Sequence, residues 1–414
     1  MDMKIRTMAW RNLWRRKRRT YITAFSIGFG VLLSVTFTGV ADDSYTKMIN
    51  TSAVMGLGHV TIEPKGYNET PSLDKRLTGA DRLREKLLQM PGVQDALIRI
   101  MGQAMLASAN KSIGGAFMAV DPSMESAGQN LFIRSIIEGQ LFSGTDSAGA
   151  VVGTTTAKKL NLSIGKKLVY TTTDVNGEIV SEIARVTGIF KTGVSEVDGA
   201  MILLPIDRVR SVLSYGPYDA TLVSIVIKDQ RRALKMLDEI DSMLDDPSRE
   251  VLNWRETQSE LASIITLDKA GNRIIQILIG LLIAAGILNT LLMSVMERTR
   301  EFGIMMAVGM APFTLFRLVI IESVWFGILG LLIGVIITIP WYAFMHYHGI
   351  DFSGMIGSDY SASGVLIDPL VKIRLFKESA AWILTSVFTL TILSGIYPAW
   401  RAGRVPPVES LKEL

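Results

Sequence analysis

The chain has no cysteine and only three histidines among its 414 residues. Without cysteine it forms no disulfide, no thiolate metal site, no cysteine nucleophile and no lipid-modified cysteine. A phosphate-binding loop is also missing, because Gly165-Lys166-Lys167 lacks the first glycine and the hydroxyl residue that hold phosphate and Mg²⁺. We therefore expect this chain to bind no cofactor. Any ATP and Mg²⁺ should bind to a separate ATPase chain.

Groups suited to catalysis are also scarce. His59 is the single histidine of the long middle region, which leaves a Ser-His-Asp hydrolase without a convincing base. His346 and His348, with Asp351 nearby, fall short of the three or four placed ligands that zinc uses. The net charge of +4 is small and the basic residues cluster, so a nucleic-acid partner is not expected. The sequence predicts a non-enzymatic chain with no metal site.

Long apolar runs are abundant instead, and 49% of the residues are hydrophobic. Residues 274–296 carry no formal charge, and residues 318–344 carry only Glu322. Each run exceeds the ~20 residues that a helix needs to cross a bilayer, and the runs 21–40 and 380–400 are about that length. The predicted fold class is an α-helical membrane protein with four transmembrane helices. A large mixed α/β extracytoplasmic domain of two subdomains lies between the first and second helices.

Charge gives the expected orientation. Residues 1–20 hold eight basic residues, whereas residues 345–379 hold three basic and four acidic ones. The positive-inside rule therefore places both termini in the cytoplasm. The expected segments are a cytoplasmic amphipathic helix at a negatively charged membrane face (1–20), a first span (21–41), an external domain (42–272), a second span (273–296), a cytoplasmic helix (297–313), a third span (315–345), an external loop (346–379), a fourth span (380–400) and a cytoplasmic tail (401–414).

Periodicity in the external region predicts mixed secondary structure. One subdomain is expected to comprise 45–129 and 217–255, with an outer subdomain, 130–216, inserted in it. The expected strands are 59–63, 93–109, 115–120, 167–174, 178–189, 200–204 and 222–228, and the expected helices are 81–89, 154–160, 206–213 and 232–244.

Between the second and third apolar runs stands Glu297-Arg-Thr-Arg-Glu-Phe-Gly-Ile-Met-Met-Ala-Val-Gly309. This joint is too charged for lipid and too short for a domain. A helical turn at the membrane surface suits it, with Gly303 and Gly309 letting the chain enter and leave. An ordinary loop between two membrane helices is the alternative.

This joint resembles the E-R-x-x-E-x-G-I-x-x-A-x-G signature of FtsX/MacB/LolC-type permeases, the membrane subunits of ABC transporters. Three further patches resemble the same family: 153–166, with Lys166 where aspartate is usual, 188–199, and the ending 397–411. The resemblance implies that the joint is a coupling helix touching an ATPase subunit. Its expected coupling residues are Glu297, Arg298, Thr299, Arg300, Glu301, Gly303 and Gly309.

The resemblance also implies function and partners. The expected protein is a permease subunit in the bacterial inner membrane that works by mechanotransmission. Its preferred task is the release of lipoproteins. MacB-like export of drugs or peptides is one alternative, and FtsX-like regulation of cell-wall hydrolases is another. The implied partners are two ATPase subunits, a second identical or related permease, and a periplasmic carrier or adaptor. The substrate itself is not defined.

Two smaller features complete the expectations. Runs 167–174 and 178–189 meet at Asn176-Gly177, which favours a type I′ hairpin turn. Its polar tip is either a partner-docking site or a surface turn without a partner. In the third span, small residues favour close helix packing, within one subunit or across a dimer. Glu322 is expected to pair with Arg317 or to face a wet interface. The tip residues are Asp174, Asn176, Gly177 and Glu178, and the packing residues are Gly327, Gly330 and Gly334.

Overall fold

The structure is a computed structural model, and it describes residues 2–244, 246–356, 361–362, 365–366 and 368–404. The chain divides into two compact units. We call residues 2–44, 267–351 and 370–404 the helical unit, and the described residues of 45–266 and 352–369 the sheet unit. The prediction for 405–411 lies outside the described residues.

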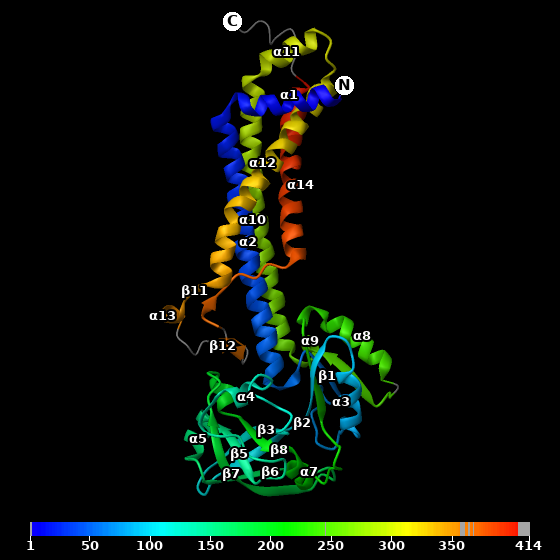
Figure 1. Cartoon of the computed structure of the whole chain (residues 1–414), viewed down its shortest axis with the longest axis vertical. Helices are drawn as coiled ribbons and strands as arrows, with labels where there is room; N and C mark the ends of the chain where they lie inside the picture. Colours follow the sequence, from blue (N-terminus) through cyan, green and yellow to red (C-terminus); the bar gives the residue numbers. More distant parts are fainter. Residues whose placement is uncertain (1, 245, 357–360, 363–364, 367, 405–414) are drawn as a thin grey trace. The chain divides into compact units, whose positions relative to one another are not determined.

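Four helices of the described chain are long and apolar enough to cross a membrane, which confirms the four predicted apolar helices. In Figure 1, α2, α10, α12 and α14 run side by side in the helical unit, with α1 lying across one end. The helices with residues in this unit are α1 (Asp2–Arg15), α2 (Lys17–Ser52), α10 (Ser259–Glu297), α11 (Thr299–Ala307), α12 (Pro312–Tyr347) and α14 (Lys377–Ala402); strand β11 (Ile350–Asp351) pairs with β14 (Leu370–Val371).

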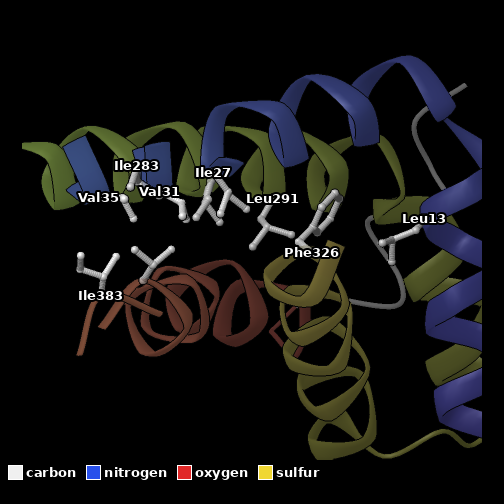
Figure 2. Close-up of a cluster of buried hydrophobic side chains, with 10 residues drawn as sticks. Leu13, Ile27, Val31, Val35, Ile283, Leu291, Phe326 and Ile383 are labelled. Carbon is white, nitrogen blue, oxygen red and sulfur yellow. The ribbon is translucent and has the colours of Figure 1, made fainter. Parts of the chain in front are cut away.

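Branched aliphatic side chains fill the space between these helices. Ile27 and Val31 of α2, Ile283 of α10 and Ile383 of α14 are buried in one cluster. Figure 2 shows these side chains converging from different helices. Since β-branched side chains have few rotamers in a helix, they lose little entropy when packed.

Small residues decide how closely α2 and α12 approach. A Cβ built on Gly330 would lie 2.5 Å from the Cβ of Ile27, and one built on Gly334 would lie 2.9 Å from the Cβ of Val31. A Cβ on Gly327 would lie 3.0 Å from the ring of Phe388 on α14. The predicted packing stripe is therefore occupied by helices of the same chain, as the first of the two alternatives required.

We predict that Gly330→Ala destabilises the helical unit, because the added methyl overlaps Ile27. Overpacking of this kind costs about 1–3 kcal/mol. Gly286→Ala on α10 is the matched control, since no atom lies within 4 Å of its Cβ position. Alanine is also the better helix former, so the control should melt at or above the wild-type temperature. Thermal unfolding in detergent measures both variants, and equal melting temperatures would exclude the close contact.

The sheet unit holds one ten-stranded sheet. Its strand order is β10-β1-β9-β2-β3-β8-β5-β7-β4, and β6 pairs with β2 and β7. The predicted strands and helices of this region are present within a few residues, whereas β4, β5 and β10 were not predicted. The strands are β1 (Val60–Pro64), β2 (Val93–Ala107), β3 (Ser112–Val120), β4 (Ile136–Gly139), β5 (Gly149–Gly153), β6 (Lys167–Thr173), β7 (Ile179–Phe190), β8 (Met201–Pro205), β9 (Leu222–Ile227), β10 (Arg249–Asn253), β12 (Ser361–Ala362) and β13 (Val365–Leu366).

Short helices connect and cover these strands. They are the π-helix Ala53–Leu57, α3 (Ala80–Leu88), α4 (Leu131–Arg134), α5 (Thr154–Leu160), α6 (Ser195–Asp198), α7 (Ile206–Val212), the 3₁₀-helix Gln230–Arg232, α8 (Ala233–Met243), α9 (Trp254–Thr257) and α13 (Ser353–Ile356).

Strand β2 joins the two halves of the sheet. Residues 93–99 pair with β9, and residues 100–107 pair with β3. The change of partners therefore falls inside β2. A buried ion pair lies beside this change: Arg99 donates two hydrogen bonds of 2.7 and 2.8 Å to Glu125 and a third to the carbonyl oxygen of Gly56.

Candidate functional site

The joint between α10 and α11 is built around one guanidinium. Arg298 Nη1 donates to Glu322 Oε1 at 2.9 Å, and Arg298 Nε donates to Glu301 Oε2 at 3.1 Å. The same guanidinium lies 5.0 Å from the ring centre of Phe302, which favours a cation–π contact. The Arg298 and Glu322 side chains are 11% and 5% exposed, so their charges compensate each other away from solvent.

Glu322 also receives a bond from the N-terminal helix. Asn12 Nδ2 on α1 donates to Glu322 Oε1 at 2.7 Å, beside the bond from Arg298. The expected pairing with Arg317 is therefore corrected: the guanidinium that reaches Glu322 comes from the α10–α11 joint. Sequence distance hid this pair, because 24 residues separate the two side chains.

The two joint glutamates face the basic N-terminal segment. Arg19 donates two hydrogen bonds of 2.8 and 2.9 Å to Glu297, and Arg16 also forms an ion pair with Glu297. Arg15 Nη1 donates to Glu301 Oε1 at 2.6 Å. These groups, with Arg298 and Glu322, line a cavity of about 100 Å³. The fork of an arginine matches a carboxylate, which makes the Arg19–Glu297 pair the most directional of these contacts.

Glu297 and Glu301 are therefore paired with cations of the N-terminal segment. Reversing both charges would set two cations against Arg15, Arg16 and Arg19. Residues 1–20 were expected at the membrane surface, so their pattern did not indicate these three arginines as partners. The sequence does place two acidic residues, four positions apart, directly after the second apolar run, and these can pair with the basic residues of 1–20.

Residues 299–307 form helix α11, so the loop alternative is excluded. Gly303 is buried inside this helix and does not open it, contrary to the expectation. Gly309 does end it, with a φ of 100° that favours glycine. Fully buried Phe302 packs with Ile5 and Ala9 of α1 and with Leu315 of α12. Ile5 and Ala9 on the apolar side of the N-terminal helix are therefore buried against other helices of this chain.

The other side of α11 remains exposed. Its exposed side chains include Arg300, Ile304 and Val308, and Phe313 at the start of α12 extends the apolar surface. Val308 is 84% exposed and Phe313 is 67% exposed. We call Ile304, Val308 and Phe313 the exposed apolar face. Of the expected coupling residues, Glu297, Arg298 and Glu301 hold the joint inside the chain, whereas Arg300 lies at the surface.

The hairpin tip differs from its predicted form. Gly177 has a φ of 82°, whereas Asn176 is not among the residues with positive φ, so the turn is not type I′. Asp174 is 5% exposed and accepts hydrogen bonds from the backbone N–H groups of Asn176 and Glu178. The Glu178 bond holds the pKa of the Asp174 carboxyl below its usual value. Asp174 thus stabilises the turn, and Asn176, Gly177 and Glu178 are exposed.

The histidines have structural contacts. His346 Nδ1 lies 2.9 Å from the carbonyl oxygen of Ile373, and the His348 ring stacks on Phe344. His59 is buried and hydrogen-bonds to Asn50 through Nε2. Among the described residues, no three histidine, cysteine or acidic side chains gather as a metal site.

Four apolar helices together with a mixed α/β unit define an integral membrane protein with a large extramembrane domain. Residues 273–407 match the FtsX-like permease C-terminal domain, and residues 20–242 match the MacB-like periplasmic core domain. The chain therefore belongs to the FtsX-like family of ABC transporter permeases that carry a MacB-like periplasmic core.

Proteins with different names are similar to this chain. An uncharacterized ABC transporter permease of Methanocaldococcus jannaschii is 23% identical over 98% of this chain and 97% of its own length. The macrolide export ATP-binding/permease protein MacB of Marinobacter nauticus is 24% identical over 97% of this chain but only 59% of its own length. The lipoprotein-releasing system transmembrane protein LolE of Haemophilus influenzae is 24% identical over 64% of each chain.

We predict that Arg298→Met destabilises the protein, because it leaves Glu322 buried without its cation. Breaking a buried pair costs about 3–5 kcal/mol. The double variant Arg298→Met/Glu322→Met should recover much of this loss, since an apolar pair leaves no charge unmatched. Thermal unfolding in detergent measures each variant. Arg300→Met is the matched control at an exposed position two residues away, and an equal shift in that control would refute the prediction.

Proposed function

We propose that this permease is the mechanotransmission subunit of an ABC transporter in the cytoplasmic membrane, with α11 as its coupling helix. Two ABC ATPase subunits, which bind the ATP and Mg²⁺, and a second identical or related permease would complete the transporter. Both chain termini would then lie in the cytoplasm, as the basic residues of 1–20 favour. The supporting observation is that α11 is anchored on one side by ion pairs and exposes apolar side chains on the other.

The exposed apolar face suits a protein partner. Ile304 lies on α11, Val308 directly after it and Phe313 at the start of α12, and all three are more than 45% exposed. Exposed apolar residues that form a patch are typical of an interaction site. Force applied to α11 would pass through Arg298 to α12 and through Glu297 and Glu301 to the N-terminal segment. Such transfer needs no catalytic residue in the permease.

We propose MacB-like export as the transport task, ahead of the lipoprotein release expected from the sequence. MacB matches nearly the whole of this chain, whereas LolE matches 64% of it. The outer hairpin β6–β7 is also short and closed by only three residues between Asp174 and Glu178.

We further propose that the hairpin tip meets a periplasmic adaptor through polar contacts. Asn176 and Glu178 are exposed there, and Asp174 keeps the turn rigid through its three hydrogen bonds to the tip. A preorganised tip loses little conformational entropy on binding, which favours its use as a contact.

Val308→Asp should weaken ATPase binding without unfolding the permease, since the residue is almost fully exposed. The loss of a central apolar contact in an interface typically exceeds 1 kcal/mol, or about fivefold in affinity. Co-purification with the ATPase and ATP hydrolysis in nanodiscs measure the effect. The matched control is Tyr347→Asp, which is 74% exposed and lies at the C-terminal end of α12, the end far from Val308. Normal ATPase binding by Val308→Asp would leave α11 a mere connector.

Gly177→Ala should disturb the hairpin tip, because alanine at positive φ costs about 1–2 kcal/mol. Asn176→Ala carries no such strain; it removes the exposed amide together with its hydrogen bond to Asp174. If the tip is the adaptor contact, both variants lower adaptor binding in a pull-down with purified adaptor while ATP hydrolysis stays normal. Glu138→Ala, exposed on β4, is the control. Wild-type adaptor binding by both tip variants would reject the docking site.

A further inference from the structure

A cavity of about 410 Å³ opens in the sheet unit, on the face where β2 changes partners. Its wall includes Met101, Phe117 and Leu222, which are apolar, and Tyr67 and Thr172, which are polar. The volume falls within the range of small-molecule sites. Tyr67 Oη donates to the Met101 carbonyl oxygen at 2.7 Å and Thr172 Oγ1 donates to the Gln103 carbonyl oxygen at 2.8 Å, so these parts of the wall are preformed.

One carboxylate oxygen in this wall has no hydrogen-bond partner among the described residues. Glu63 of β1 is 2% exposed and lines the cavity. Within the described residues its Oε1 atom is buried and accepts no hydrogen bond. Buried polar atoms are nearly always hydrogen-bonded, and an ionised carboxylate is costly to bury alone. The cavity therefore contains an acceptor that a bound molecule can satisfy.

The Asn68 backbone N–H and the Glu250 carboxyl hydrogen-bond to the Glu63 carboxyl group, but its Oε1 atom stays without a partner. Glu250 faces it across the β1–β10 pair and uses its own Oε1 to accept the Gly66 N–H at 2.8 Å. Lys75 is the nearby cation, but its Nζ donates to the Gly66 carbonyl oxygen at 2.6 Å and to the Thr70 carbonyl oxygen at 3.0 Å. Burial above all, reinforced by Glu250, raises the pKa of Glu63 to about 7.

We propose that this cavity binds a small molecule that carries a protonated amine beside an apolar group, with the ammonium on Glu63. The ammonium supplies the donor and the opposite charge that the carboxylate lacks. Met101 and Leu222 offer surface for the apolar group. An alcohol of the same shape can donate a hydrogen bond but brings no charge, and an anion gains only the apolar contact. The site belongs to the sheet unit alone and does not depend on the proposed transport task.

Binding of the amine should also depend on pH. Because Glu63 takes up a proton near pH 7 in the empty cavity, an ammonium binds only after that proton leaves. The apparent affinity should therefore fall about tenfold for each pH unit below 7 and level off above it. An alkylamine with a pKa near that of lysine stays charged throughout this range, so the change reports on the protein.

The test uses the full chain in nanodiscs and three probes of one shape: 2-phenylethylamine, 2-phenylethanol and phenylacetate. Isothermal titration at pH 8 should show saturable binding of the amine, with the alcohol and the acid at least tenfold weaker. Glu63→Gln should weaken amine binding about 10- to 100-fold, the range expected for a lost charge-assisted hydrogen bond. It should also abolish the dependence on pH.

Two further variants guard against trivial outcomes. Thr173→Trp places a large ring at the exposed rim of the cavity and should block the amine while Glu63 is retained. Glu138→Gln, on the exposed β4 strand, should bind the amine as the wild type does. Equal binding of all three probes would reveal an unselective apolar or solvent-filled cavity. That result would overturn the proposal, as would unchanged affinity in Glu63→Gln or no saturable amine binding at millimolar concentration.

Discussion

The buried Arg298–Glu322 pair fixes how α1, α11 and α12 meet. One guanidinium satisfies carboxylates from α11 and α12, and Asn12 adds a bond from α1. Each group alone would be a costly charge or dipole away from water, so the three segments are stable only together. The apolar cluster around Phe302 packs beside them and excludes water, which strengthens the ionic contacts further.

The middle of the helical unit uses a different principle. There Gly330 and Gly334 let α12 approach α2 until Ile27 and Val31 touch its backbone. Contacts of this kind depend on fit, because lipid chains solvate an aliphatic side chain as well as a neighbouring helix does. A close-packed interface has one good register, so it transmits displacement along the helices and absorbs little of it.

The sequence predicts what local pattern determines. Apolar run length gave the four long helices, and alternation gave most of the strands of the sheet unit. It could not give pairings between distant segments. Arg19 and Glu297 are 278 positions apart, and no periodicity links them. The predicted type I′ turn at Asn176-Gly177 was wrong for a related reason. Asp174 accepts hydrogen bonds from the backbone at the tip and favours a three-residue loop in which only Gly177 needs positive φ. The cavity at Glu63 could not be predicted from the sequence, because the register of the strands decides which acidic side chain is buried.

The ionic joint and the glycine contacts differ in how they can move. Glu297 and Glu301 face three arginines, namely Arg15, Arg16 and Arg19. A carboxylate among several guanidinium groups can exchange partners while it remains paired, so a shift of α11 against α1 need not leave a charge exposed to an apolar environment. Arg298 has no such surplus, because Glu322 is buried with it. Under the proposed function, α11 keeps its buried bond to α12, the helix that must carry the motion, while the more exposed ion pairs of Glu297 and Glu301 can exchange partners.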